Sequence, residues 1–270
     1  MLKFKSSLRF LVAVGAMALS AAQANAGFTS YVIRSTPTIT PVGSNVEFVI
    51  SASGQKAGYG SNDINGIRVD EIASLKITRF DDPTRFTAGS GPAVAPYFNI
   101  WVTDGLGNYA AIANEPSNPD FQPLFEGSPT GPKTYDLSFA DLANKVVKVY
   151  ETAGTGTNFT WVHAALGLTG QSLTFAQVAN LTIAPPPTTY FTSGLDGVGS
   201  GAPREIGSFT TFGFNWIFGD TLSNYTSGAP GYIVGNAEVA ATPEPTSAVL
   251  LGLGAAGFAA IRRRRKASKV

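Results

Sequence analysis

Phe209-Thr210-Thr211-Phe212-Gly213-Phe214-Asn215-Trp216-Ile217-Phe218 is the stretch that most strongly indicates the fold class. Aromatic side chains at Phe212, Phe214 and Trp216 alternate with small or polar ones. Because successive side chains of a β-strand point to opposite faces, this period of two predicts a strand with one face on a hydrophobic core. The stretch therefore predicts a sheet protein.

Other short runs rich in β-branched and aromatic residues lie between turn residues and predict further strands. They cover Val46–Ser51, Leu75–Phe80, Tyr97–Thr103, Tyr109–Ala113, Val146–Glu151, Phe159–His163, Leu181–Ala184 and Tyr232–Ala240. No long amphipathic helical pattern separates them, which argues against a parallel α/β sheet. We expect an all-β fold, an antiparallel β-sandwich with one or two short helices, as a single ectodomain over residues 27–242.

Turn-forming residues predict long loops between these strands, and long loops often carry function. The expected loops are Ser53–Asn65, Asp81–Pro96, Glu115–Pro132, Ala153–Asn158, Pro185–Thr188 and Gly194–Pro203.

Two segments 36 residues apart match position for position: Leu137–Asn144 and Leu173–Asn180. Ser138 precedes Asp141 by three residues, and Thr174 precedes Gln177 by three, which is the capping-box pattern at a helix start. We expect a helix of one or two turns in each segment, closing a sheet edge and leading into a strand. Chance reuse of the same helix-start pattern is the alternative.

The N-terminus has the pattern of a secretory signal peptide over residues 1–26. Three basic residues precede the apolar run Phe10–Leu19, and Ala24-Asn25-Ala26 is a small-x-small cleavage site. We expect signal peptidase to cut after Ala26, so that the mature chain begins at Gly27. An uncleaved anchor is the alternative.

The C-terminus, residues 243–270, joins a rigid polar tripeptide, an apolar segment and a basic stop. Pro243-Glu244-Pro245 is followed by an uncharged segment over Ala248–Ile261, and then by Arg262, Arg263, Arg264, Arg265 and Lys266. The segment is short for a bilayer that usually requires about 20 residues, although arginine side chains can snorkel to the interface. We expect a transmembrane helix whose basic end stays in the cytoplasm.

This order of features resembles the PEP-CTERM signal of Gram-negative bacterial surface proteins. The resemblance implies that an exosortase-like transpeptidase recognises Pro243, Glu244 and Pro245 and processes the chain near them. It leaves the exact bond open. An ordinary C-terminal anchor that is never cut is the alternative.

Two central stretches also resemble hairpins of sorted β-sandwich ectodomains. They are Tyr97–Gly105 with Gly107–Tyr109, and Phe218–Tyr225 with the following strand. The resemblance implies a sandwich of jelly-roll or lectin-like type and carries over no ligand-binding residue.

Charge excludes some partners of the mature part. Residues 27–245 contain ten of the 19 Lys and Arg residues and all 18 Asp and Glu residues, which gives a formal net charge of −8. A nucleic-acid binder needs a basic patch, so we expect no nucleic-acid partner. The chain has no cysteine, and therefore no disulfide, thiol nucleophile or thiolate metal site.

The sequence contains no residue cluster that supports a named reaction. His163 is the only histidine and lies among apolar neighbours, which favours a structural role. Glycoside hydrolysis needs two carboxylates at a suitable separation. Asp70-Glu71 and Asp81-Asp82 are adjacent in sequence, so on strands they would point to opposite faces.

Binding sites are equally weakly marked. Asp104-Gly105-Leu106-Gly107-Asn108 has alternating oxygen ligands and glycines, so a calcium ion near Asp104 stays open, but Asp-Gly more often marks a hairpin turn. Tyr59, Tyr97 and Trp101 could stack on sugar rings, although such aromatics are more often core. We assign no catalytic residue, no metal site and no cofactor.

These patterns together predict a non-enzymatic surface protein associated with exopolysaccharide. It would be exported by the Sec machinery, held in the inner membrane by its C-terminal helix in transit, and delivered to the envelope or extracellular matrix. A carbohydrate-binding module is the main alternative, and a polysaccharide hydrolase is the second.

Overall fold

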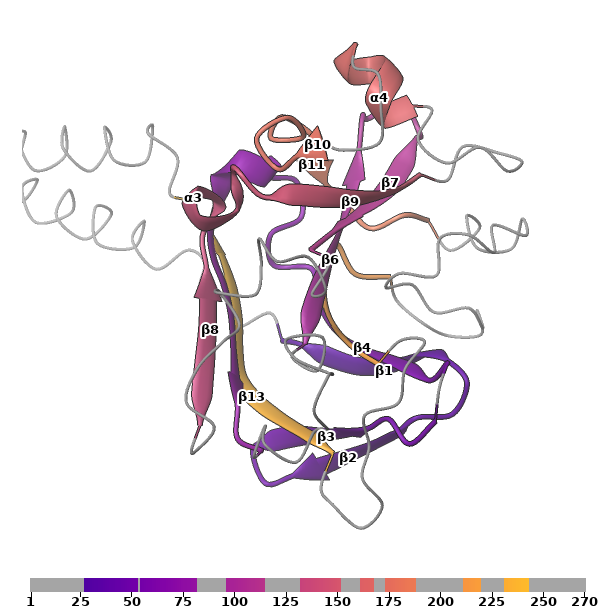
Figure 1. Ribbon diagram of the computed structural model, residues 1–270, viewed down its shortest axis with the longest axis vertical. Coiled ribbons are helices and arrows are strands. Elements are labelled where there is room, and N and C mark those ends of the chain that lie inside the picture. Colours follow the sequence, from indigo (N-terminus) through magenta and orange to yellow (C-terminus); the bar gives the residue numbers. More distant parts are fainter. Residues whose placement is uncertain are drawn as a thin grey trace, which may run out of the picture.

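The computed structural model describes residues 27–52, 54–81, 96–114, 132–151, 161–167, 173–187, 211–219 and 231–242. In these ranges the chain forms two antiparallel sheets and a few short helices (Figure 1). The strands are β1 (Thr29–Arg34), β2 (Thr38–Val42), β3 (Asn45–Val49), β4 (Lys56–Ser61), β5 (Ile72–Arg79), β6 (Tyr97–Thr103), β7 (Tyr109–Ala113), β8 (Lys133–Leu137), β9 (Val146–Glu151), β10 (Leu173–Thr174), β11 (Thr182–Ile183), β12 (Phe214–Phe218) and β13 (Tyr232–Ala241). The helices are η2 (Val69–Glu71), α3 (Phe139–Leu142) and α4 (Trp161–Leu166).

The larger sheet has the order β1-β4-β12-β6-β7-β9-β10, with β11 paired to the end of β6. The smaller sheet has the order β2-β3-β13-β5-β8. Neighbouring strands in both sheets are antiparallel, so the predicted all-β, antiparallel class is confirmed.

The two sheets share one hydrophobic core. Phe214, Trp216 and Phe218 of β12 point into it, while Asn215 and Ile217 point to the other face of the sheet. The predicted alternation is correct for Phe214 and Trp216, but Phe212 precedes β12 and packs with Tyr31 on the Ile217 side. Phe218 stacks on Phe48 of β3, with ring centroids 4.1 Å apart, which joins the larger sheet to the smaller one.

The sequence predicted most strand positions correctly. The predicted bounds of β6, β7 and β9 agree with the structure, and β3, β5, β11, β12 and β13 lie within or close to their predicted runs. The strands β1, β2, β4, β8 and β10 were not predicted.

One predicted strand is wrong. Phe159–His163 was expected to be extended, but Trp161–Leu166 forms the helix α4, and residues 159 and 160 lie outside the described ranges. Val162 is fully buried, and the Trp161 indole donates a hydrogen bond to the backbone oxygen of Tyr109. These contacts hold α4 against the start of β7.

One predicted loop is also wrong, because β4 lies inside Ser53–Asn65. Gly58 and Gly60 weaken strand propensity in the sequence. In the fold they leave room for aromatic rings, since a Cβ atom on Gly58 would lie 2.5 Å from Cζ of Tyr31. Gly58 thus reflects close packing within a strand.

The two matching segments behave differently. In α3 the Asp141 carboxylate accepts hydrogen bonds from the backbone N–H and the hydroxyl of Ser138, as the capping pattern predicts. The Gln177 side chain accepts the equivalent bond from the Thr174 backbone N–H, but residues 175–180 form turns instead of the predicted helix.

Backbone groups of the second segment bond to the first segment and the residue after it. The N–H groups of Phe175 and Ala176 donate to the oxygens of Lys145 and Ala143, at 3.1 and 2.9 Å. The two segments therefore pack on one another. They lie beside the edge strands β8 and β10, and they lead into the strands β9 and β11, as expected.

Candidate functional site at the end of the last strand

Strand β13 leads directly to the C-terminal signal, and it lies in the middle of the smaller sheet. It pairs with β3 over Tyr232–Val234 and with β5 from Val234 to Ala241. Its side chains Tyr232, Val234 and Val239 are buried in the core. Hydrogen bonds on one side and then the other hold this strand over its whole length.

Two carboxylates, Glu47 of β3 and Asp81 after β5, bind backbone N–H groups at the beginning of β13. The Gly231 N–H donates to the Glu47 carboxylate at 2.5 Å, and the Ile233 N–H donates to Oδ1 of Asp81 at 3.0 Å. Asp81 also pairs with Arg79, and both side chains are almost fully buried. The Tyr232 ring lies over the Arg79 guanidinium at 5.2 Å.

A bulge bends the middle of β13. The register with β5 shifts between Gly235 and Glu238. Asn236 lies there with a φ of 50°, a left-handed conformation that asparagine tolerates better than most residues.

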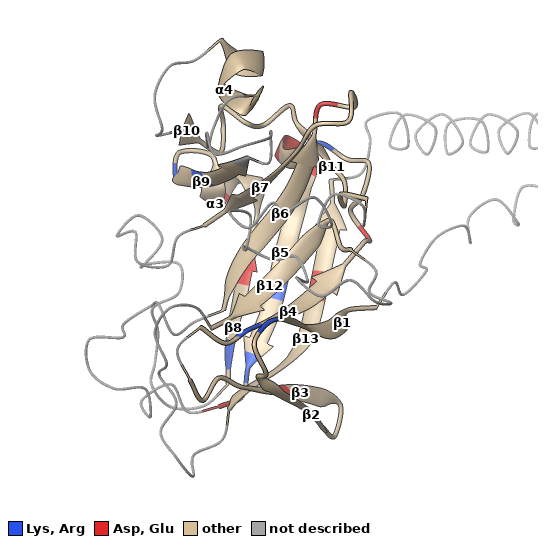
Figure 2. Ribbon diagram, turned by 90° about the vertical axis from the view of Figure 1, so that its right-hand side faces the viewer, with Lys and Arg blue, Asp and Glu red and all other residues tan. Residues whose placement is uncertain are grey.

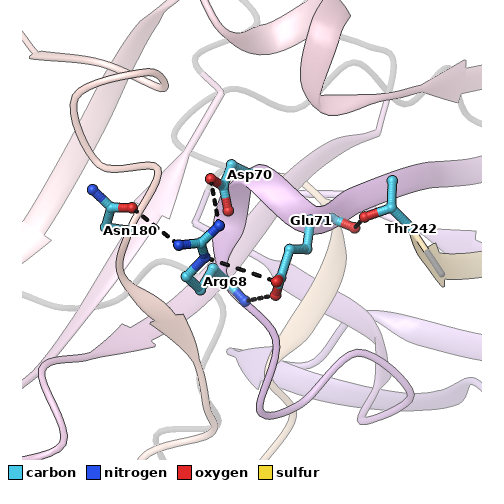
Figure 3. Close-up of polar contacts among 5 residues, drawn as sticks. All are labelled: Arg68, Asp70, Glu71, Asn180 and Thr242. Carbon is cyan, nitrogen blue, oxygen red and sulfur yellow. Dashed lines mark hydrogen bonds and ion pairs between the residues drawn. The ribbon is translucent and has the colours of Figure 1, made fainter. Parts of the chain in front are cut away.

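The end of β13 is fastened by η2. The Thr242 N–H donates to the backbone oxygen of Glu71 at 2.7 Å, and the Thr242 hydroxyl donates to the same oxygen at 3.1 Å (Figure 3). Thr242 is the last described residue, and Pro243 follows it in the chain.

Polar side chains surround this point. The Glu71 carboxylate accepts from the Arg68 backbone N–H at 2.7 Å, and the Arg68 guanidinium contacts Asp70 at 3.0 Å and Asn180 at 3.5 Å (Figure 3). We call Arg68, Asp70, Glu71, Asn180 and Thr242 the exit cluster. It joins three segments that are distant in sequence, η2, the turn before β11 and the end of β13.

The exit cluster is a set of partly exposed ion pairs and hydrogen bonds around Arg68. The Arg68 side chain is 49% exposed, and exposed ion pairs stabilise a fold little. The sequence argument assumed that Asp70 and Glu71 lie on a strand. They lie in η2 instead, and both carboxylates form ion pairs with Arg68. They are held by a cation, which is not the arrangement of a free catalytic pair.

Most residues of the predicted sorting and cleavage sites lie outside the described ranges. These are Ala24, Ala26, Pro243, Glu244, Pro245 and Arg262, Arg263, Arg264, Arg265 and Lys266. Gly27 is described and is exposed, two residues before β1. Within the described ranges, no helix is long and apolar enough to cross a membrane, and the predicted transmembrane segment lies beyond them.

Asp104 forms a hairpin turn between β6 and β7. Its carboxylate accepts from the Leu106 N–H at 2.8 Å and from the Asn108 side-chain amide at 2.6 Å. Gly105 and Gly107 have positive φ angles, which supports the hairpin interpretation. The described part of the chain contains no group of three or more acidic or histidine side chains that could hold a metal ion.

The remaining candidates are packed into the fold. His163 is 6% exposed on α4, and Trp101 is 1% exposed. The Tyr59 ring packs between Phe28 and Phe48, so it belongs to the core side of β4. Tyr97 is half-buried, with the Lys56 ammonium 5.6 Å from its ring centroid.

Sequence reasoning missed the side chains that fasten β13. Arg79 and Asp81 are two residues apart, so on a strand their side chains share a face. Because they are opposite in charge, an ion pair between them could have been predicted from the sequence. Arg68 and Thr242 gave no such signal, because only the fold brings them near Glu71.

Comparison with known proteins identifies the C-terminus. The family model of the PEP-CTERM protein-sorting motif matches residues 241–265, which confirms the resemblance found in the sequence. The match begins at the last residue of β13. Searches of curated proteins and of solved structures find no match to the chain. The motif implies a secreted protein that is sorted by an exosortase, passing through the membrane on its way to the surface or exterior.

Proposed function

Because the chain carries a PEP-CTERM protein-sorting motif at residues 241–265, we propose that it is a non-enzymatic surface component associated with exopolysaccharide. The Sec machinery exports it and signal peptidase cuts it after Ala26. Its C-terminal helix then holds it in the inner membrane until an exosortase-like transpeptidase processes it near Pro243–Pro245.

The observation that carries this proposal is the place where the fold ends. β13 is fastened at its start by Glu47 and Asp81, and at its end by the hydrogen bonds from Thr242 to Glu71. The motif follows at once, at Pro243. A cut beyond Thr242 therefore removes no residue of either described sheet, so the ectodomain can leave the membrane intact.

The architecture supports a structural role. Two antiparallel sheets on one core are compatible with a sandwich of jelly-roll or lectin-like type. Three of the four carboxylates weighed for catalysis have structural partners: Asp70 and Glu71 with Arg68, and Asp81 with Arg79. Asp82 lies outside the described residues. The contacts of the other three favour a scaffold over a hydrolase.

Sorting is tested by cell fractionation of a variant with Pro243, Glu244 and Pro245 all changed to Ala. We expect wild-type protein in the envelope and medium, and the variant in the inner membrane. The control changes Thr246 and Ser247 to Ala, beside the motif, and should fractionate as wild type. A triple variant released as efficiently as wild type would disprove recognition of the motif.

The association with exopolysaccharide is tested on mature protein recovered from the medium. Mixed with the host's isolated exopolysaccharide, it should co-sediment with the polymer and leave the polymer's chain length unchanged. Shortening of the polymer would show a hydrolase instead. A protein that stays in the supernatant would disprove its association with exopolysaccharide. Saturable binding to one defined oligosaccharide would favour the carbohydrate-binding module.

A further inference from the structure

The distance between the fold and the apolar segment is short. Thr242 is fixed to η2, and five residues separate it from Ala248, where the uncharged segment begins. A fully extended chain spans at most about 3.6 Å per residue, so these residues reach roughly 20 Å. While that segment lies in a membrane, the Thr242 end of the ectodomain stays close to the lipid surface.

The other end of the ectodomain is much farther away. The ten residues of β13 span about 33 Å at roughly 3.3 Å per residue. At its start β13 pairs with β3, with Tyr232 opposite Phe48 and Val234 opposite Val46. The turn at Gly43 and Ser44 that joins β2 to β3 is therefore level with the residues just after Val234, about 20 Å along the strand from Thr242 at roughly 3.3 Å per residue. The strands β2 and β3 lie at the bottom of both ribbon views, whereas α4, β10 and β11 lie at the top.

The hairpin turn of Asp104–Asn108 lies at the same end as Thr242. Thr103, the last residue of β6, pairs with Thr182 of β11, and Thr182 also forms a bridge with Arg68 of the exit cluster. The turn and the exit cluster are therefore neighbours across β11, which lies beside the end of β6 in Figure 2.

This turn carries an exposed apolar side chain. Leu106 is 86% exposed at its tip, and the hydrogen bonds of Asp104 fix the turn beneath it. Among the described residues, the other exposed large hydrophobic side chain is Val42, 40% exposed, at the end of β2.

We propose that the end formed by the exit cluster and the Asp104–Asn108 turn faces the membrane before processing, and that Leu106 enters the lipid interface. The proposal rests on the proposed anchoring by the C-terminal segment. The partner is a phospholipid surface. The residues between Thr242 and Ala248, here called the tether, keep this surface near. Charge does not attract it, because Asp70, Glu71 and Asp104 outnumber the exposed Arg68 in these two groups of residues.

One consequence concerns release. A single apolar side chain supplies little membrane affinity, since even a myristoyl chain gives only marginal binding. The contact at Leu106 therefore orients the ectodomain while the tether is intact and does not retain it after processing.

The test uses the absence of cysteine from the chain. Leu106→Cys, Ser44→Cys and Val42→Cys, each in the full chain, receive one environment-sensitive fluorophore and are reconstituted into vesicles of phosphatidylethanolamine and phosphatidylglycerol. Vesicles with quencher groups on the lipid headgroups then report how near each label lies to the surface. Val42→Cys is the matched control, because it also replaces an exposed apolar residue.

We expect the label at position 106 to be quenched several-fold more than the labels at positions 42 and 44. All three sites are exposed, so unfolding temperatures should match wild type. Equal quenching at the three positions, or stronger quenching at 44, in protein that floats with the vesicles would overturn the proposed orientation alone. Protein that does not float with the vesicles would overturn both the orientation and the proposed anchoring.

Discussion

At the scale of single residues, the buried pair of Arg79 and Asp81 is the most important electrostatic contact. Its side chains are 3% and 0% exposed, and Asp81 also accepts the N–H of Ile233 in β13. Breaking one partner of a buried ion pair is costly because the other charge stays buried. The pair thus holds the start of the strand that leads to the sorting motif.

We predict that Asp81→Asn lowers the free energy of unfolding by about 3 kcal/mol. The control is Asp63→Asn, an exposed position, which should change it by less than about 0.5 kcal/mol. Urea unfolding of the two variants and wild type measures both values. Equal, small effects would show that the Arg79–Asp81 pair does not stabilise the fold.

Two other carboxylates make stability depend on pH. Partial burial acts to raise the pKa of Asp104, but hydrogen bonds from Asn108 and Leu106 outweigh it, so the pKa lies below its usual value. The hydroxyl and the N–H of Ser138 lower the pKa of Asp141 in the same way. A carboxylate whose pKa is lower in the folded state than in the unfolded state stabilises the fold at pH values above the unfolded pKa of about 3.9. This stabilisation is lost as the pH falls through the pKa of the folded state.

We therefore predict that wild type loses more stability between pH 5 and pH 2 than the double variant Asp104→Asn/Asp141→Asn. Unfolding curves of both proteins across this range measure the difference. If the two proteins lost the same stability, the hydrogen bonds to these carboxylates would not persist in solution.

At the scale of elements, strand β4 shows how glycine permits close packing of one sheet. The ring of Tyr31 lies over Gly58 and stacks on Phe212, with centroids 5.4 Å apart. Tyr31 also donates a hydrogen bond to Asn215 of β12. The glycine thus lets an aromatic side chain link β1 to β12 across β4.

We predict that Gly58→Ala lowers the free energy of unfolding by about 1–3 kcal/mol, because the added methyl group overlaps the buried Tyr31 ring. Gly27→Ala is the control, since a Cβ atom there meets nothing within 4 Å. Thermal unfolding compares the two. A Gly58→Ala protein as stable as the control would show that the ring moves aside at little cost.

The elements also show what the sequence could and could not predict. Alternation of side chains identified β12, and runs of β-branched and aromatic residues between turn residues identified β6, β7 and β9. These patterns failed for α4, since Trp161 and Val162 are apolar and fit a buried strand or a buried helix equally well. The Trp161 indole bonds to the backbone oxygen of Tyr109, a contact with a residue far away in sequence that the local pattern does not contain.

The same limit applies to the candidate site. Pro243, Glu244 and Pro245 were recognisable because a sorting signal is a contiguous pattern, and the family match confirms that pattern. The exit cluster was not, because Arg68, Asn180 and Thr242 meet only when η2, the turn before β11 and β13 are in place.

At the scale of the whole molecule, the fold predicts where truncation is tolerated. A chain of residues 27–242 keeps both described sheets, whereas residues 27–231 lack β13, the strand between β3 and β5. We expect cooperative thermal unfolding of the first chain, and aggregation or non-cooperative unfolding of the second. Failure of residues 27–242 to fold would show that the tail takes part in the ectodomain.

The central claim is that processing separates an intact ectodomain from its tail. Its most direct test is the intact mass of the protein recovered from the envelope and the medium. The account predicts a chain that begins at Gly27, retains Thr242 and lacks Arg262–Val270, while the Pro243→Ala/Glu244→Ala/Pro245→Ala variant retains Val270. A wild-type mass that includes Val270, or one that ends before Thr242, would contradict it.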